Sequence, residues 1–81
     1  MDEHGKVTII LEDYRVKKNI SKNKIVENAK VQRTQLQNYL LNKVSRVDLD
    51  VLARICNYLD CEISDVLKFE KPVKEKEKLL K

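Results

Sequence analysis

Four polar residues in the middle of the chain, Gln32, Arg33, Thr34 and Gln37, have side chains suited to contacts with the edges of base pairs. An arginine guanidinium offers a two-pronged fork to guanine, a glutamine amide pairs with adenine, and a threonine methyl can meet the methyl of thymine. This chemistry needs a rigid support that presents the side chains together. An ordinary solvated helix face remains the alternative interpretation of the same residues.

The support is predicted to be a pair of short helices, at about 22–28 and 32–41, joined by about three residues. Ser21 is a favourable N-cap for the first of them. Ile25 and Leu36 are placed to pack the two helices against each other. Two helices with this spacing are typical of a helix-turn-helix unit, in which the second helix enters the major groove of DNA.

The remaining segments complete an all-α fold of five short helices. The β-branched stretch Lys6–Ile10 can form a short N-terminal strand or lead directly into a first helix that runs to about Lys18. Asp48 is expected to cap the most periodic helix of the chain. Its apolar stripe is predicted to contain Leu49, Leu52, Ile55, Cys56 and Leu59. A last short helix is expected to contain Ile63, Val66 and Leu67.

Composition narrows the classes of protein further. The 81 residues are 42% apolar and 37% charged, with a single glycine and a single proline, which argues against an all-β barrel or sandwich. No apolar run is long enough for a membrane span. The two cysteines are too few for a disulfide framework and fit a reduced, cytoplasmic compartment.

Positive charge is concentrated in the first half of the chain. Between Lys6 and Arg46 there are ten basic residues against three acidic ones, although the net charge of the whole chain is only +4. Lysines and arginines that neutralise phosphates release condensed counterions, so this half favours a nucleic-acid partner.

From Lys6 to Phe69 the chain resembles the Cro/repressor-type (XRE family) helix-turn-helix regulators of the small single-domain type. The segments that carry the resemblance are 21–26, 31–36, 48–52, 55–56 and 59–67. It implies a compact five-helix bundle of the lambda-repressor-like type that binds operator DNA as a homodimer.

Matched by position, the resemblance also assigns roles to single residues. The base-reading set is Gln32, Arg33, Thr34 and Gln37, and the phosphate-binding set is Lys22, Asn38, Lys43 and Arg46.

Three positions depart from the family pattern. Lys30 stands where a glycine with positive φ is usual, which costs about 1 kcal/mol for a side chain in the left-handed region. Gln32 replaces the usual Ser or Thr cap. Leu36, Tyr39 and Leu40 are spaced for burial. Leu40 and Leu41 cannot easily both be buried, so one of them is expected to face solvent or a partner.

The domain organisation predicted is a frayed opening at 1–5, one DNA-binding domain at 6–70 with its helix-turn-helix unit at about 21–41, and a basic, flexible tail at 71–81. Neither catalysis nor a cofactor is expected. His4 is the only histidine and no nucleophile with a general base can be assembled, so catalytic and metal-ligating residues are absent from the prediction.

The leading hypothesis is a cytoplasmic, sequence-specific regulator of transcription, in the role of a repressor, whose partner is a double-stranded DNA operator. No membrane and no small-molecule substrate is expected as a partner. The alternative from another class is a protein–protein adaptor or antitoxin-like partner that keeps the fold without an operator. Its surface would be Leu40 or Leu41, or the tail. An RNA-binding module is less favoured, because the aromatic content of 5% leaves few stacking platforms.

Overall fold

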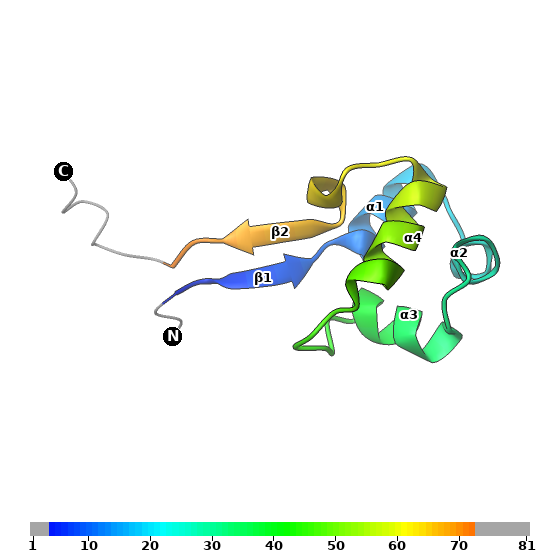
Figure 1. The fold of residues 1–81 in the computed structure, drawn as a ribbon. Helices are drawn as coiled ribbons and strands as arrows, with labels where there is room; N and C mark the ends of the chain where they lie inside the picture. Colours follow the sequence, from blue (N-terminus) through cyan, green and yellow to red (C-terminus); the bar gives the residue numbers. More distant parts are fainter. Residues whose placement is uncertain (1–3, 73–81) are drawn as a thin grey trace.

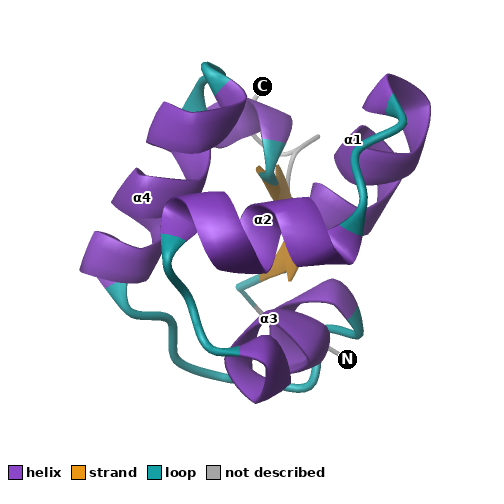
Figure 2. Ribbon diagram, turned by 90° about the vertical axis from the view of Figure 1, so that its right-hand side faces the viewer, coloured by secondary structure: helices purple, strands orange, loops and turns teal. Residues whose placement is uncertain are grey.

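The helices of this chain form one body, and a two-stranded ribbon projects from it (Figure 1). A computed structural model describes residues 4–72. Their elements in chain order are β1 (Lys6–Ile9), α1 (Leu11–Lys18), α2 (Lys22–Ala29), α3 (Arg33–Leu40), α4 (Leu49–Leu59), the 3-10 turn η1 (Ile63–Asp65) and β2 (Leu67–Glu70). In Figure 2, α2 crosses in front of the strands, with α3 below it and α4 beside it.

Local capping chemistry accounts for the helix boundaries. The Ser21 hydroxyl accepts a hydrogen bond from the backbone N–H of Lys24 at 3.1 Å, which confirms the predicted N-cap of α2. Asp48 caps α4 in the same way, accepting from the Asp50 N–H at 2.9 Å. Lys30 ends α2 with a φ of 56°, as the family resemblance implies for this position. Left-handed residues of this kind stop a helix sharply and turn the chain.

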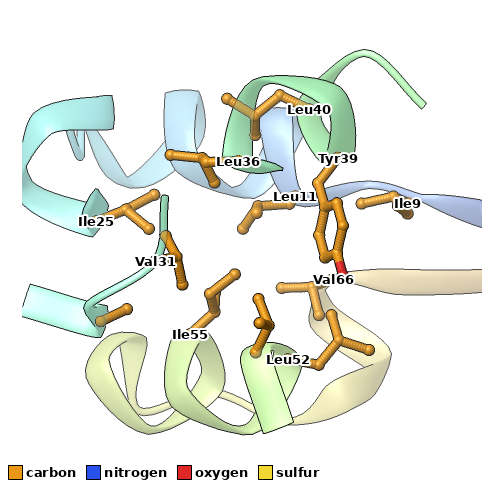
Figure 3. Close-up of a cluster of buried hydrophobic side chains, with 12 residues drawn as sticks. Ile9, Leu11, Ile25, Val31, Leu36, Tyr39, Leu40, Leu52, Ile55 and Val66 are labelled. Atoms are coloured by element: carbon orange, nitrogen blue, oxygen red, sulfur yellow. The ribbon is translucent and has the colours of Figure 1, made fainter. Parts of the chain in front are cut away.

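The core lies between α1, α2, α3 and α4, at the inner end of the ribbon (Figure 3). From α3 it receives Leu36, Tyr39 and Leu40, all buried as predicted, while Leu41 is 52% exposed. The other buried apolar residues are Ile9, Leu11, Ile25, Ala29, Val31, Val51, Leu52, Ile55 and Val66. Burying a large aliphatic side chain contributes about 1.5–3 kcal/mol, so α3 is held by one apolar face.

The prediction of a fifth helix is not confirmed, and the all-α class holds only in that the fold is mostly helical. The segment after α4 forms a single 3-10 turn, closed by reciprocal hydrogen bonds between the side chains and backbones of Glu62 and Asp65. The chain then extends as β2 and pairs antiparallel with β1, with Val7 opposite Phe69. This pairing satisfies backbone groups that a fifth helix would leave open on β1. The fold is therefore mostly helical with a two-stranded sheet, and the N-terminal strand is present.

The apolar stripe of α4 also differs from the prediction. Leu49 is 77% exposed, and Val51 is buried with Leu52 and Ile55 instead. The cap at Asp48 makes Leu49 the first residue of the helix, and the side that faces the core begins only at Val51. Periodicity alone could not fix this rotation of the first turn.

The predicted domain organisation stays a prediction. Residues 1–3 and 73–81, from the predicted frayed opening and the predicted tail, lie outside the described part of the chain. Gly5 is buried, with a φ of +81°, and a Cβ at this position would lie 2.3 Å from the backbone oxygen of Glu70.

Within residues 4–72, no helix combines the length and apolarity that crossing a membrane requires.

Asn42 joins the end of α3 to the first strand. Its Oδ1 accepts a hydrogen bond from the Ile9 N–H and its Nδ2 donates to the Ile9 carbonyl oxygen, both at 2.8 Å. Asn42 has a φ of 58°, a conformation that asparagine tolerates better than most residues. The left-handed backbone of Asn42 thus turns the chain after α3, and its side chain fixes the ribbon to the helical body.

We expect Asn42→Gly to lower the free energy of unfolding by about 1–3 kcal/mol, because glycine keeps the positive φ but removes two hydrogen bonds. Urea denaturation of the two proteins measures the difference. The matched control is Asn57→Ala, at an exposed position of α4. Alanine is used there because glycine would also lower the helix propensity of α4. Equal stability of Asn42→Gly and the unaltered chain would contradict this role.

Candidate nucleic-acid interface

The predicted base-reading residues lie together on the side of α3 that points away from the core. Gln32, Arg33 and Thr34 are exposed, and Gln37 is half-buried one turn later. This arrangement follows from burial of the opposite side of the helix. The side chain of Gln32 does not cap α3, as expected for a glutamine at this position. It accepts no hydrogen bond from the first backbone N–H groups of the helix.

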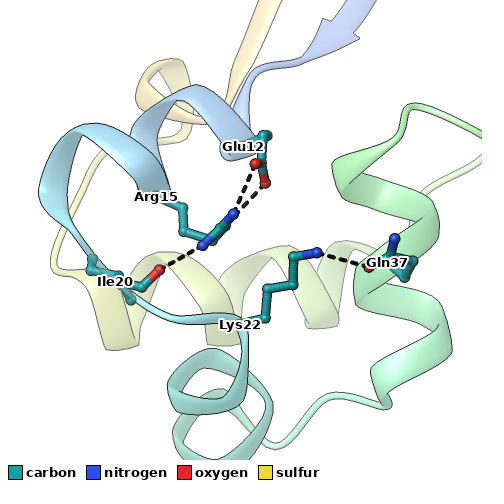
Figure 4. Close-up of polar contacts among 5 residues, drawn as sticks. All are labelled: Glu12, Arg15, Ile20, Lys22 and Gln37. Carbon is teal, nitrogen blue, oxygen red and sulfur yellow. Dashed lines mark hydrogen bonds and ion pairs between the residues drawn. The ribbon is translucent and has the colours of Figure 1, made fainter.

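Two residues at the start of α2 contact this edge of α3. Lys22 donates from Nζ to Oε1 of Gln37 at 3.4 Å (Figure 4). Asn23 accepts from Nη2 of Arg33 through its Oδ1 at 2.6 Å. A predicted phosphate-binding lysine thus lies beside a predicted base-reading glutamine. Asn23 was not predicted, and nothing in its sequence position distinguishes it, because the contact depends on how α2 crosses α3.

The other predicted phosphate-binding residues lie on α3 and in the loop after it. Asn38 is half-buried, whereas Lys43 and Arg46 are exposed. Asn38 and Arg46 line an open groove of about 850 Å³ that runs between α3, the loop and the start of α4. The groove is also lined by Thr34, so it adjoins the base-reading edge, whereas Lys43 is not part of its lining.

The loop with Lys43 and Arg46 is held at both of its ends. Asn42 fixes its beginning to β1, and at its end the Asp48 N–H donates to the hydroxyl of buried Tyr39 at 2.9 Å. The spacing of the apolar residues predicts that Tyr39 is buried but does not predict this role of its hydroxyl. The position of Asn42 at the end of α3 could in principle be predicted from the sequence, because asparagine is favoured at left-handed helix ends.

Arg15 holds the junction of α1 and α2 in place through hydrogen bonds. Its guanidinium binds both carboxylate oxygens of Glu12, at 3.0 and 2.8 Å, and donates to the Ile20 carbonyl oxygen at 3.1 Å (Figure 4). These bonds connect α1 to the residues just before Lys22. The hydrogen bond from Arg15 holds the pKa of Glu12 below its ordinary value of 4.5, with a smaller contribution from the charge of Lys22.

Within residues 4–72, no group of three or more histidine, cysteine, aspartate or glutamate side chains is placed to hold a metal ion. Cys56 and Cys61 are free and half-buried, so Cys56 is less enclosed than its place in the predicted stripe suggested. Burial raises the pKa of the Cys61 thiol to about 12, which keeps it protonated at neutral pH.

The lowered pKa of Glu12 predicts how its contribution varies with pH. A carboxylate with a depressed folded-state pKa stabilises the fold above its unfolded-state pKa, and this contribution disappears as the pH falls through the folded-state value. We expect Glu12→Gln to cost at most about 1 kcal/mol at neutral pH, because the pair is partly exposed to solvent. Denaturation at a series of pH values should show that the loss of unfolding free energy caused by Glu12→Gln becomes smaller as the pH falls, with Asp13→Asn as the control. A loss that persists at acidic pH would contradict this role of the Glu12 carboxylate.

Comparison with known proteins agrees with this geometry. The family model of the Cro/C1-type HTH DNA-binding domain matches residues 11–72. Among solved structures, the crystal structure of the transcriptional regulator VanUg, form II, has a TM-score of 0.68 at 22% sequence identity, covering 88% of this chain and 93% of that one. At this identity the likeness concerns the fold. No curated protein matches the sequence. Because the match extends over helices α1 to α4 and the ribbon strand β2, the chain belongs to the Cro/C1-type HTH DNA-binding domain family.

Proposed function

We propose that this protein is a sequence-specific regulator of transcription, acting as a repressor, that reads the major groove of an operator with α3. The observation that carries the proposal is the polar edge formed by exposed Gln32, Arg33 and Thr34 and half-buried Gln37, on a helix held by its opposite face. Membership of a DNA-binding family supports it independently. The function needs neither catalysis nor a cofactor.

The base-reading role of Arg33 is supported by its contact with Asn23. A guanidinium has five N–H donors in a planar fork, and the bond from Nη2 to Asn23 Oδ1 employs one of them. The remaining donors are free to address guanine, while the tether limits the rotamers that an exposed arginine would otherwise sample. Asn23 thus reduces the side-chain entropy lost when Arg33 engages a base.

The phosphate contacts are assigned to residues on both sides of α3. Lys22 lies on the α2 side, and Asn38, Lys43 and Arg46 lie on the side of the groove and loop. Cations on both flanks of an inserted helix fix its register on the duplex, although they carry no sequence information. Their positions therefore complement those of the base-reading set.

We further propose that the protein binds as a homodimer. Two copies related by a two-fold axis place their α3 helices about 34 Å apart, one turn of B-DNA, and so read an inverted repeat. One α3 of eight residues contacts few base pairs, and a second copy doubles the number of contacts.

Arg33→Ala is expected to weaken binding to the preferred duplex by about 1–3 kcal/mol and to relax the preference at one base-pair position. The preferred duplex is first identified by selection from random double-stranded DNA, and fluorescence anisotropy then compares it with single-base variants. Unchanged affinity and unchanged preference together would remove Arg33 from the base-reading set.

Lys43→Ala is expected to weaken binding to all duplexes alike and to reduce the slope of log affinity against log salt by about 1, as loss of one phosphate contact requires. It serves as the matched contrast to Arg33→Ala, because both remove one positive charge from an exposed position. A change in base preference on Lys43→Ala would contradict the phosphate role.

The adaptor alternative retains one supporting observation, the 52% exposure of Leu41 beside the end of α3. The same binding experiment distinguishes it from the regulator. An adaptor would show no salt-dependent affinity for duplex DNA and no enriched sequence after selection, whereas the regulator requires both.

A further inference from the structure

The two cysteines of the chain lie at the turn that ends α4. They are the only cysteines among the 81 residues, and both are free and half-buried. Cys56 lies near the end of α4 and Cys61 follows the helix, and both pack against the apolar core. Neither belongs to the edge of α3 or to the loop after it, so the proposed function gives this pair no role.

The backbone holds the two cysteines next to each other. Asp60 adopts the left-handed conformation, with a φ of 56°, and turns the chain back on itself. The Cys61 N–H then donates to the Cys56 carbonyl oxygen at 3.1 Å, and the Asp60 N–H donates to that of Asn57 at 3.3 Å. These two bonds define a Schellman motif, in which the side chains of the first and last residues come into contact. In this chain those two residues are the cysteines.

The side chains of the pair interact as well. Burial is the main cause of the raised pKa of the Cys61 thiol, and the charge of Cys56 and a hydrogen bond with it add to the shift. A disulfide spans α-carbons about 4.4–6.8 Å apart, and two residues joined by a backbone hydrogen bond lie within that range. The two sulfur atoms can therefore be joined without movement of the backbone.

We propose that Cys56 and Cys61 are a site of reversible thiol–disulfide exchange, which takes a low-molecular-weight disulfide as its co-reactant and forms a disulfide within the chain. The Cys56 thiolate attacks one sulfur of the co-reactant, whose S–S bond breaks and whose other half takes up a proton and leaves as a thiol. The Cys61 thiol then loses its proton, attacks the Cys56 sulfur of the mixed disulfide and releases the second half as a thiol. In balance, two thiols of the chain are oxidised to a disulfide, and one disulfide is reduced to two thiols.

The order of the two attacks follows from the environment of Cys61. The thiolate rather than the thiol is the attacking form, and the raised pKa keeps Cys61 protonated at neutral pH. Cys56 is therefore the residue that reacts with the co-reactant. Cys61 has to react only within the chain, where the turn holds it beside the Cys56 sulfur and no second encounter is needed.

The disulfide would strengthen the connection between the helical body and the ribbon. Cys61 begins the segment that leads through η1 to β2. Near its other end this segment is held by the Ile10 N–H, which donates to the Val66 carbonyl oxygen at 2.7 Å. A bond between Cys56 and Cys61 adds a covalent link to α4. Because it joins residues that are already adjacent in the folded chain, the oxidised chain is expected to resist unfolding better than the reduced one.

The experiment measures the equilibrium between thiols and disulfide in the full chain. The reduced chain is equilibrated without oxygen in mixtures of glutathione and glutathione disulfide, its free thiols are blocked with N-ethylmaleimide, and the products are distinguished by mass. We expect the disulfide within the chain to be the main oxidised product and to be reversed fully by excess dithiothreitol.

The same measurement in concentrated urea shows whether the fold brings the thiols together. We expect the equilibrium constant for the disulfide to be about tenfold larger, or more, in buffer than in urea, because only the folded chain contains the turn. By linkage, the oxidised chain should then unfold at a higher urea concentration than the reduced chain.

A matched control keeps two cysteines but moves one of them out of the motif. Cys56→Ser combined with Asn57→Cys places the thiol one residue further along α4, at an exposed position. Its equilibrium constant is expected to be about tenfold lower, or less, than that of the unaltered chain, with mixed glutathione disulfides as the main oxidised products. Cys56→Ser and Cys61→Ser alone form only mixed or interchain disulfides and so identify those products. Circular dichroism checks that every variant keeps its helices.

An equilibrium constant that is no larger in buffer than in urea would overturn the proposal, because folding would then not bring the thiols together. So would mixed or interchain disulfides as the main products of the unaltered chain, or a control that closes as readily as the unaltered chain. DNA takes no part in the measurement. Its failure would therefore leave the function proposed for α3 standing, and failure to bind a duplex would leave the disulfide site standing.

Discussion

The attachment of α3 through a single apolar face is the constraint on which the rest of the structure depends. Leu36, Tyr39 and Leu40 insert into the core formed by α2 and α4, which leaves the opposite edge of the helix in solvent. A helix buried more completely would hide its polar residues, and one buried less would not hold a fixed orientation. The exposed edge is therefore a direct consequence of where the apolar residues fall along these eight positions.

Several hydrogen bonds convert this attachment into a defined orientation. Asn42 fixes the end of α3 to β1, the hydroxyl of Tyr39 accepts from the start of α4, and Arg54 of α4 donates to the Lys30 carbonyl in the turn before α3. The turn itself accepts a left-handed lysine at a cost of about 1 kcal/mol. One of these bonds joins the end of α3 to β1 and two join α3 or its preceding turn to α4, so the helix has little freedom to pivot on its apolar face.

Local signals in the sequence predicted much of this arrangement. The caps at Ser21 and Asp48 and the burial of one side of α3 follow from side chains that act within a turn or two of themselves. The positive φ at Lys30 is implied only by the family resemblance. Long-range contacts were not predictable in this way. The strand after η1 forms because β1 is beside it, Leu49 faces solvent because of the rotation of α4, and Asn23 contacts Arg33 only through the crossing of two helices. The contacts with bases and phosphates that are assigned to single residues remain part of the proposed function.

The central claim is that the solvent-facing edge of α3 is the surface that meets DNA. The most direct measurement is an NMR titration of the 15N-labelled protein with the duplex selected from random DNA. The account predicts the largest shift changes at the amides and side chains of residues 32–37, with further changes at 22 and 43–46, and little change on the outer surface of α4. Changes confined to α4 or the ribbon, with the edge of α3 unaffected, would contradict it.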